Sequence, residues 1–151
     1  MSSTDYLRRL VDHGHWANER WMTQLDNQLL SDERLRQLMS HILLSEQVWF
    51  QRISGAPLDR EIWRTLGTSE MQALHARNRV TYEDLLGHAR DRRIAYERFT
   101  GERYASTVSD ILLHLCLHGM HHRGQMARHA SERQLPAPNT DFLNYCIVNG
   151  L

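Results

Sequence analysis

Residues 108–129 decide the fold, and they read Val-Ser-Asp-Ile-Leu-Leu-His-Leu-Cys-Leu-His-Gly-Met-His-His-Arg-Gly-Gln-Met-Ala-Arg-His. One stripe of this segment, spaced by alternating steps of three and four, consists of Val108, Ile111, Leu115, His118, His122, Gln125 and His129. This spacing is the period of an amphipathic helix, in which such residues share one face. The segment therefore predicts a helix over about 108–133, with Thr107 or Ser109 as its N-cap.

Helical periodicity also dominates the rest of the chain, and alternating β-branched runs are nearly absent. Further helices are expected over about 5–28, about 31–53 with Ser31 as its N-cap, about 69–99, and 141–148. Gly55 and Pro57 should end the second helix, and residues 55–68 should connect it to the third with a helical turn around Glu61 to Leu66. Residues 101–106 should form a break before the fourth helix, which Pro136-Ala-Pro138 should close. We therefore predict an all-α fold, a four-helix bundle with a short C-terminal helix, as one domain over residues 1–151.

The composition is typical of a folded globular protein. The chain has 151 residues, of which 41% are hydrophobic and 24% charged, so it can bury a core. Its 18 basic residues balance 18 acidic ones, which predicts no basic surface for nucleic acid. No apolar run approaches the ~20 residues of a membrane span, and the first six residues lack the layout of a secretory signal. We expect a cytoplasmic protein with no nucleic-acid or membrane partner.

Several reaction classes are excluded by residue types that the sequence lacks. All basic residues are arginine, so a lysine Schiff base, a lysine nucleophile and a P-loop lysine are excluded. Cys116 and Cys146 are the only cysteines and form no CxxC motif, which predicts small apolar fillers rather than a disulfide or thiolate zinc site. The Glu-x-x-His motif that ferritin-like dimetal bundles repeat is also absent, which disfavours a dimetal oxidase.

The histidines point instead to a metal site. His118 and His122 are four residues apart on the apolar stripe, where Cβ atoms lie about 5–6 Å from one another. Two imidazoles at this spacing can reach one ion at the ~2.0–2.1 Å of a zinc–nitrogen bond. Large polar rings on a buried face need partners, and one cation would serve both.

Geometry alone leaves alternatives open. His118 and His122 can also be ordinary core histidines that bind no metal. If they do bind an ion, a third ligand has to come from another helix. His41 is a candidate at the margin of its helix's apolar face, and it competes with His13, His15, His75 and His88. His114 and His121 lie at the edge of the stripe, where they could support a ligand or face solvent, and His129 lies too far along the helix to share the ion.

Two segments carry a family resemblance. Residues 38–55 read Leu-Met-Ser-His-Ile-Leu-Leu-Ser-Glu-Gln-Val-Trp-Phe-Gln-Arg-Ile-Ser-Gly, and the second segment joins Asp110-Ile-Leu-Leu-His114 to His118-Gly-Met-His-His-Arg-Gly-Gln125. They resemble the two signatures of the DinB/YfiT-like superfamily of metalloenzymes. Trp16-Ala-Asn18, Pro136-Ala-Pro138 and the segment Asp141-Phe-Leu-Asn-Tyr145 fit as well, so the resemblance spans most of the chain.

The resemblance implies a four-helix bundle, a homodimer, and one divalent ion held by His41, His118 and His122. Nickel or zinc is the expected metal, with iron, manganese or copper as other possibilities. Three imidazoles suit zinc, nickel, iron and copper alike, so the ligands do not choose among these four ions. It further implies a thiol-dependent S-transferase or isomerase, with a low-molecular-weight thiol and a small electrophile as partners. A metal-dependent hydrolase and a non-catalytic, stress-associated metal-binding protein are the alternatives. The absence of an obvious separate general base favours the thiol reaction.

Four further residues of these segments have open roles. Arg123 either pairs with Asp141 or an acidic substrate, or is a solvated arginine. Glu46 could orient a ligand histidine, although an ordinary surface charge is the preferred interpretation. Trp16 and Trp49 are expected in the core or in a pocket wall.

Overall fold

The computed structural model describes residues 3–26 and 32–151. Its elements are α1 (Ser3–Gln24), α2 (Glu33–Ser54), α3 (Thr68–His88), β1 (Arg93–Glu97), β2 (Arg103–Thr107), α4 (Val108–Glu132) and α5 (Phe142–Val148). The predicted bundle with a short C-terminal helix is thereby confirmed. The expected end of the first helix near residue 28 and the expected N-cap Ser31 lie outside the described residues. None of the described helices is long and apolar enough to cross a membrane.

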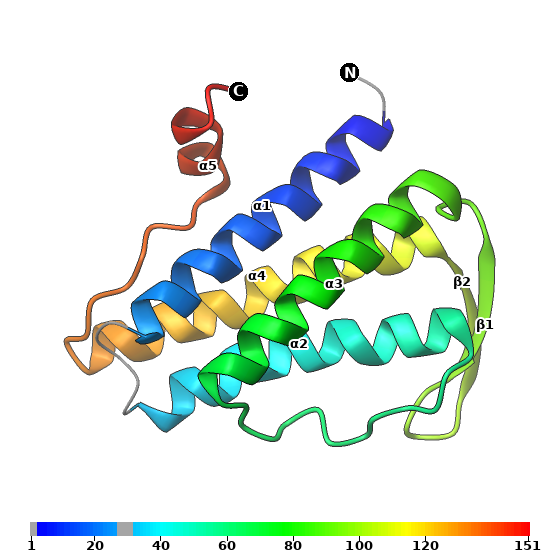
Figure 1. Ribbon diagram of the computed structural model, residues 1–151, viewed down its shortest axis with the longest axis horizontal. Helices are drawn as coiled ribbons and strands as arrows, with labels where there is room; N and C mark the ends of the chain where they lie inside the picture. The colour runs from blue at the N-terminus through cyan, green and yellow to red at the C-terminus, as the bar shows by residue number, and fades with distance from the viewer. Residues whose placement is uncertain (1–2, 27–31) are drawn as a thin grey trace.

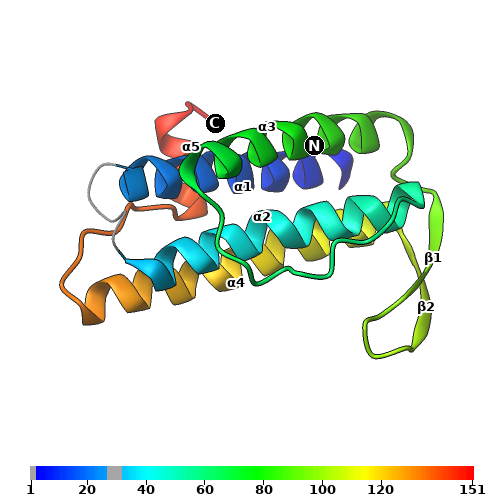
Figure 2. The ribbon, with the colours of Figure 1, turned by 60° about the horizontal axis from the view of Figure 1, so that its bottom comes forward.

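The four long helices form a bundle in which α2 and α3 run in one direction and α1 and α4 in the other (Figure 1). Each of α1 and α2 packs against both α3 and α4. Helices α2 and α4 are therefore neighbours, and they run in opposite directions. Since α2 and α3 are parallel, residues 55–67 return along the length of the bundle before α3 begins (Figure 2). This return segment contains a turn at residues 62–63 rather than the expected helical turn. Gly55 ends α2 in the left-handed conformation, with φ of 76°.

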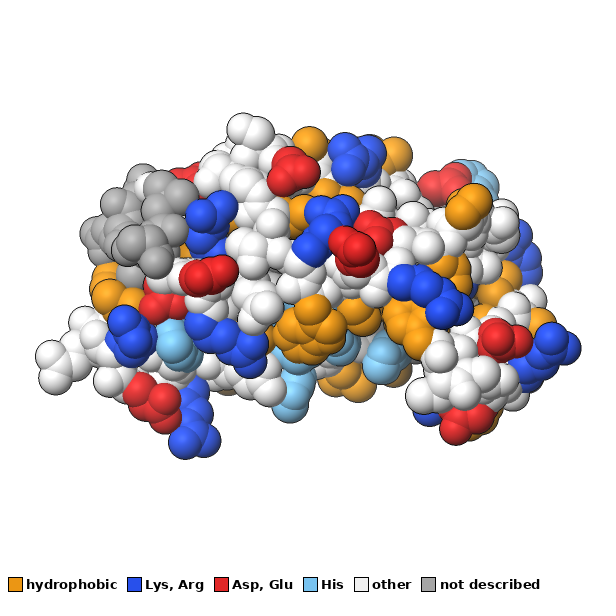
Figure 3. Space-filling model, turned by 90° about the horizontal axis from the view of Figure 1, so that it is seen from below, with side chains coloured by type: hydrophobic (Ala, Val, Ile, Leu, Met, Phe, Trp, Pro, Cys, Tyr) orange, Lys and Arg blue, Asp and Glu red, His pale blue; other side chains and the backbone are white. Residues whose placement is uncertain are grey.

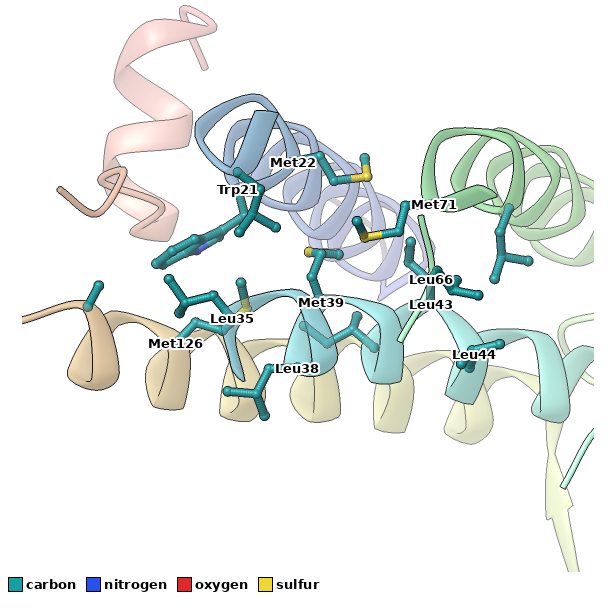
Figure 4. Close-up of a cluster of buried hydrophobic side chains, with 14 residues drawn as sticks. Trp21, Met22, Leu35, Leu38, Met39, Leu43, Leu44, Leu66, Met71 and Met126 are labelled. Atoms are coloured by element: carbon teal, nitrogen blue, oxygen red, sulfur yellow. The ribbon is translucent and has the colours of Figure 1, made fainter. Parts of the chain in front are cut away.

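Two clusters of buried side chains form the core. One joins α1, α2, α3 and the end of α4, and Met22, Met39 and Met71 point toward one another within it (Figure 4). The other lies toward the hairpin and includes Leu112 and Leu115 of α4. Because α4 contributes to both clusters, its apolar stripe determines which of its polar residues face inward.

The prediction that the third helix continues to about residue 99 is wrong. The helix ends at His88, and β1 pairs antiparallel with β2 in the register Arg93 to Thr107. Ile94 and Tyr96 are half-buried between exposed neighbours, which is the period-two pattern of a strand. The predicted break at residues 101–106 accordingly contains the turn, where Gly101 has φ of 92°, and most of β2.

Asp32 joins the beginning of α2 to the end of α4. Its carboxylate accepts the Leu35 backbone N–H at 3.0 Å as the N-cap of α2. The same carboxylate lies 3.0 Å from Nε2 of His129 and 3.2 Å from Nε of Arg133. This side chain therefore satisfies a helix terminus and connects the two helices at the same point.

Replacing Asp32 should measurably weaken the bundle. We expect Asp32→Ala to lower the free energy of unfolding by about 1–3 kcal/mol, because the cap and two charge-assisted contacts are lost. Asp32→Asn retains the cap and should lose less. Urea denaturation measures the effect, with Asp91→Ala at an exposed surface pair as the control, expected within ~0.5 kcal/mol of wild type. Equal losses in Asp32→Ala and Asp91→Ala would contradict the assigned role.

Candidate metal centre

Three imidazoles converge where α2 packs against α4. His41 projects from α2, and His118 and His122 project from consecutive turns of α4. One ring nitrogen from each residue lies within 4.8 Å of those of the other two, so the three could hold a metal ion. His41 and His122 are buried and His118 is half-buried. The helical pair derived from spacing and the third residue implied by the resemblance are therefore brought together.

The spacing of the nitrogens suits a shared ion. Nε2 of His118 and Nε2 of His122 face one another at 3.1 Å. Two nitrogens bound tetrahedrally at the zinc–nitrogen distance would lie about 3.3 Å apart. A proton on one nitrogen can bridge this gap in the metal-free protein, and a divalent ion can take the place of that proton.

His41 is oriented by the return segment. Its Nδ1 donates to the backbone carbonyl of Ile62 at 2.8 Å, which leaves Nε2 as the free ligand atom. The Trp63 indole stacks on the His41 ring with centroids 3.5 Å apart and planes 5° apart. Residues 62 and 63 thus fix both the tautomer and the plane of this ring. The sequence analysis did not assign a role to Ile62 or Trp63. The only signal that could have pointed to them is a tryptophan inside a polar connection.

His122 is oriented by its own helix. Its Nδ1 donates to Oε1 of Gln125 at 2.8 Å, and the Gln125 amide nitrogen lies 3.1 Å from Nε2 of His121. If the amide nitrogen donates to His121, Gln125 has to accept from His122, and Nε2 of His122 is then free to bind an ion. His121 consequently acts through Gln125 rather than as a ligand.

The imidazoles are neutral at pH 7. Burial, together with the nearby His122 ring, lowers the pKa of His41 to about 4. Burial, together with the rings of His122 and His41, lowers the pKa of His118 to about 3. Burial also lowers the pKa of His122. Metal binding requires neutral imidazole, so these rings need not lose a proton at neutral pH before they bind an ion.

The competing histidines lie elsewhere. His13 contacts the backbone oxygen of Thr140 at 2.7 Å, and His15 stacks edge-on against Tyr82. His75 bonds Glu19, and His88 is exposed near the end of α3. None of these joins the three-histidine cluster in the described part of the chain. His114 lies one turn before His118 with ring centroids 6.0 Å apart, beside the cluster rather than in it.

The interpretation of Glu46 as a surface charge is wrong. Its carboxylate is buried and accepts from the Asn78 amide at 2.8 Å. Burial raises the pKa of Glu46 to about 7, against the opposing effects of the Asn78 bond and the Arg123 charge. Because Nδ1 of His41 is already bonded to Ile62, Glu46 does not orient that ligand.

Arg123 is also an interior residue and not a solvated one. It is 5% exposed and donates to Oδ1 of Asn18 at 2.8 Å, and no ion pair joins it to Asp141 among residues 3–26 and 32–151. A Cβ atom at Gly119 would lie only 2.8 Å from its Nη1. Gly119, next to His118, therefore provides the space that the guanidinium of Arg123 occupies.

A model of the DinB family matches residues 1–147. The chain belongs to the DinB family. No curated protein matches the sequence. In this DinB chain the signature segments coincide with the parts of α2 and α4 that carry the histidine cluster and the buried Arg123.

Two glycines of α4 should respond oppositely to alanine. A Cβ at Gly124 meets nothing within 4 Å, so Gly124→Ala should raise the free energy of unfolding by about 0.5–1 kcal/mol through helix propensity. In Gly119→Ala the same gain is offset because Arg123 has to move and lose its bond to Asn18. We expect Gly119→Ala to be less stable than Gly124→Ala by about 1–2 kcal/mol in chemical denaturation. Equal stability of the two variants would show that Arg123 relocates without cost.

Proposed function

We propose that this protein is a metal-dependent enzyme in which His41, His118 and His122 hold one divalent ion, nickel or zinc, for reaction with a low-molecular-weight thiol. The supporting observation is the convergence of three neutral imidazoles within 4.8 Å. Three neutral ligands leave the ion its full charge and an open coordination position, which is the pattern of catalytic rather than structural zinc sites.

A bound ion would supply a Lewis acid that lowers the pKa of a thiol or a water molecule. The residues around it supply orientation. The Ile62 carbonyl and Gln125 direct one nitrogen each from His41 and His122 toward the common point, and Trp63 covers the His41 ring. Trp63 is 46% exposed and His118 is half-buried, so the cluster lies near the molecular surface.

The proposed reaction is an S-conjugation. A thiol loses its S–H proton to water, the sulfur electron pair forms a C–S bond with the electrophile, and the leaving group departs with the electrons of the bond that breaks. A hydrolase would require activation of a water molecule, usually by a general base that is separate from the metal ligands. The cluster in the described residues consists of histidines alone, which favours the thiol as the nucleophile.

Metal content tests the site directly. Purified wild-type protein loaded with nickel or zinc should retain about one ion per chain, and the His118→Ala/His122→Ala variant should retain almost none. His88→Ala, which removes an exposed histidine from α3, is the control and should bind like wild type. A free metal concentration of one hundred times the Kd should raise the free energy of unfolding of the wild-type protein by about 2.7 kcal/mol. Unchanged metal content in the double variant would overturn the site.

Enzymatic activity is tested with the metal-loaded protein, small thiols and monochlorobimane. We expect conjugation, read by fluorescence, to depend on the metal and to fall at least tenfold in the double variant, because the ligand pair is lost. Turnover of activated esters without added thiol would indicate the hydrolase instead. Tight metal binding with neither activity would indicate a non-catalytic metal-binding protein.

A further inference from the structure

A hollow lined by arginine and aromatic side chains lies next to the histidine cluster. It has a volume of about 310 Å³ and lies between α2, the return segment and the hairpin turn, with Trp49, Arg52, Arg98 and Phe99 in its wall. Ile62, whose carbonyl holds His41, also lines it. Figure 3 faces this side of the molecule and shows histidine side chains near the middle and basic side chains beside the protruding hairpin.

The arginines are positioned by aromatic rings. The guanidinium of Arg52 lies 4.6 Å from the Trp49 ring centroid and 5.0 Å from that of Phe99. Arg60 lies 4.9 Å from the same Phe99 ring, and Arg98 lies over Tyr104 at 4.6 Å. Stacking uses the face of a guanidinium and leaves its in-plane N–H groups available to an acceptor.

No acidic side chain of the described residues forms an ion pair with these three arginines. Among the acidic residues nearby along the chain, Asp59 pairs with Arg64, Glu97 with Arg103, Glu102 with Thr100, and Asp110 with Thr107. Glu61 follows Arg60 directly and is exposed, and it forms no ion pair within the described residues. Within the described chain, Nε of Arg52 is buried and has no hydrogen-bond partner. Burial, followed by the charges of Arg60 and Arg98, lowers the pKa of Arg52. An unneutralised group of like charges at a partly buried place is costly, and an anion would relieve that cost.

Shared wall residues connect the hollow with the surroundings of the cluster. A second hollow of about 220 Å³ shares Trp49 and Arg98 with the first and reaches His114, whose ring neighbours His118. Asp110 also lines this second hollow, but its carboxylate accepts from Thr107. Arg52 follows His41 by eleven positions, so the two residues share one face of α2 and lie about 16 Å apart along the helix. The gap to be spanned is therefore on the order of 10 to 15 Å.

We propose that Arg52, Arg60 and Arg98 bind the anionic end of a small co-substrate, a carboxylate or a phosphate, whose other end reaches the histidine cluster. Arginine suits this role because its forked donors match both anions. The required length fits an acidic thiol of about tripeptide size better than a short thiol. The reacting end of this inference rests on the proposed function, whereas the anion contact does not.

The first experiment uses the metal-free protein, so that it does not depend on the proposed function. Citrate and inorganic phosphate are titrated separately by calorimetry at low salt. We expect at least one of them to bind, with an affinity that falls roughly tenfold or more in Arg52→Gln and in Arg98→Gln and that weakens at high salt. Arg128→Gln removes an exposed arginine of α4 and should bind like wild type. The tighter ligand distinguishes a carboxylate from a phosphate.

The second experiment tests whether one molecule contacts both the metal site and the arginines. Nickel-loaded protein is titrated with glutathione and with glutathione diethyl ester, which share one thiol and one length but differ in carboxylate charge. Sulfur-to-nickel charge-transfer absorption should show at least tenfold tighter binding of the free acid, and Arg52→Gln should abolish the difference. If Arg52→Gln fails to fold, Arg60→Gln, at an exposed position, tests the same point.

The outcomes separate the two proposals. Equal affinity for the acid and the ester would overturn the anion site while the metal site stands. Failure of the protein to retain nickel would overturn the proposed function, and the metal-free titrations would still decide the anion site. Binding of neither citrate nor phosphate to the metal-free protein, or losses in Arg128→Gln equal to those in Arg52→Gln, would overturn the inference.

Discussion

The contact between α2 and α4 is the constraint on which the rest of the structure depends. These two antiparallel helices carry all three members of the histidine cluster, so their relative position determines whether the rings meet. Asp32 holds one end of this contact by capping α2 and pairing with His129 of α4. The apolar stripe of α4 sets its rotation, because it contributes to both core clusters. The site is therefore built on rigid elements, as binding geometry requires.

Behind the cluster, the bundle contains polar groups that are satisfied by one another. Arg123 donates to Asn18, and Glu46 accepts from Asn78, so residues from all four long helices meet around buried charges. Such groups are costly when unpaired and specify one arrangement when paired. The absence of a side chain at Gly119 is part of this arrangement, since it leaves the path of the guanidinium open. The same segment of α4, residues 118–123, therefore carries two histidines of the cluster and also the buried Arg123.

The face around the cluster is made by the segments between helices. Because α2 and α3 run parallel, their connection has to travel the length of the bundle, and this route places Ile62 and Trp63 on His41 (Figure 2). The hairpin brings Arg98 and Phe99 toward Arg52 of α2. The helices therefore supply the three imidazoles, and the connections supply the orientation, the cover and the positive charge next to them.

The sequence alone predicted the helices of the bundle and the inward pair His118 and His122, because both follow from periodicity within single segments. It left the N-cap of α4 open between Thr107 and Ser109, and the structure has Thr107 there. It predicted a helix where β1 lies, since two half-buried residues, Ile94 and Tyr96, are too weak a strand signal to outweigh the preceding helical pattern. Only the tertiary structure decided the meeting of these rings with His41, the burial of Glu46 and Arg123, and the arginine hollow. Those features depend on helix order and on the paths of connections, and contacts between residues far apart in the chain leave no periodic signal in it.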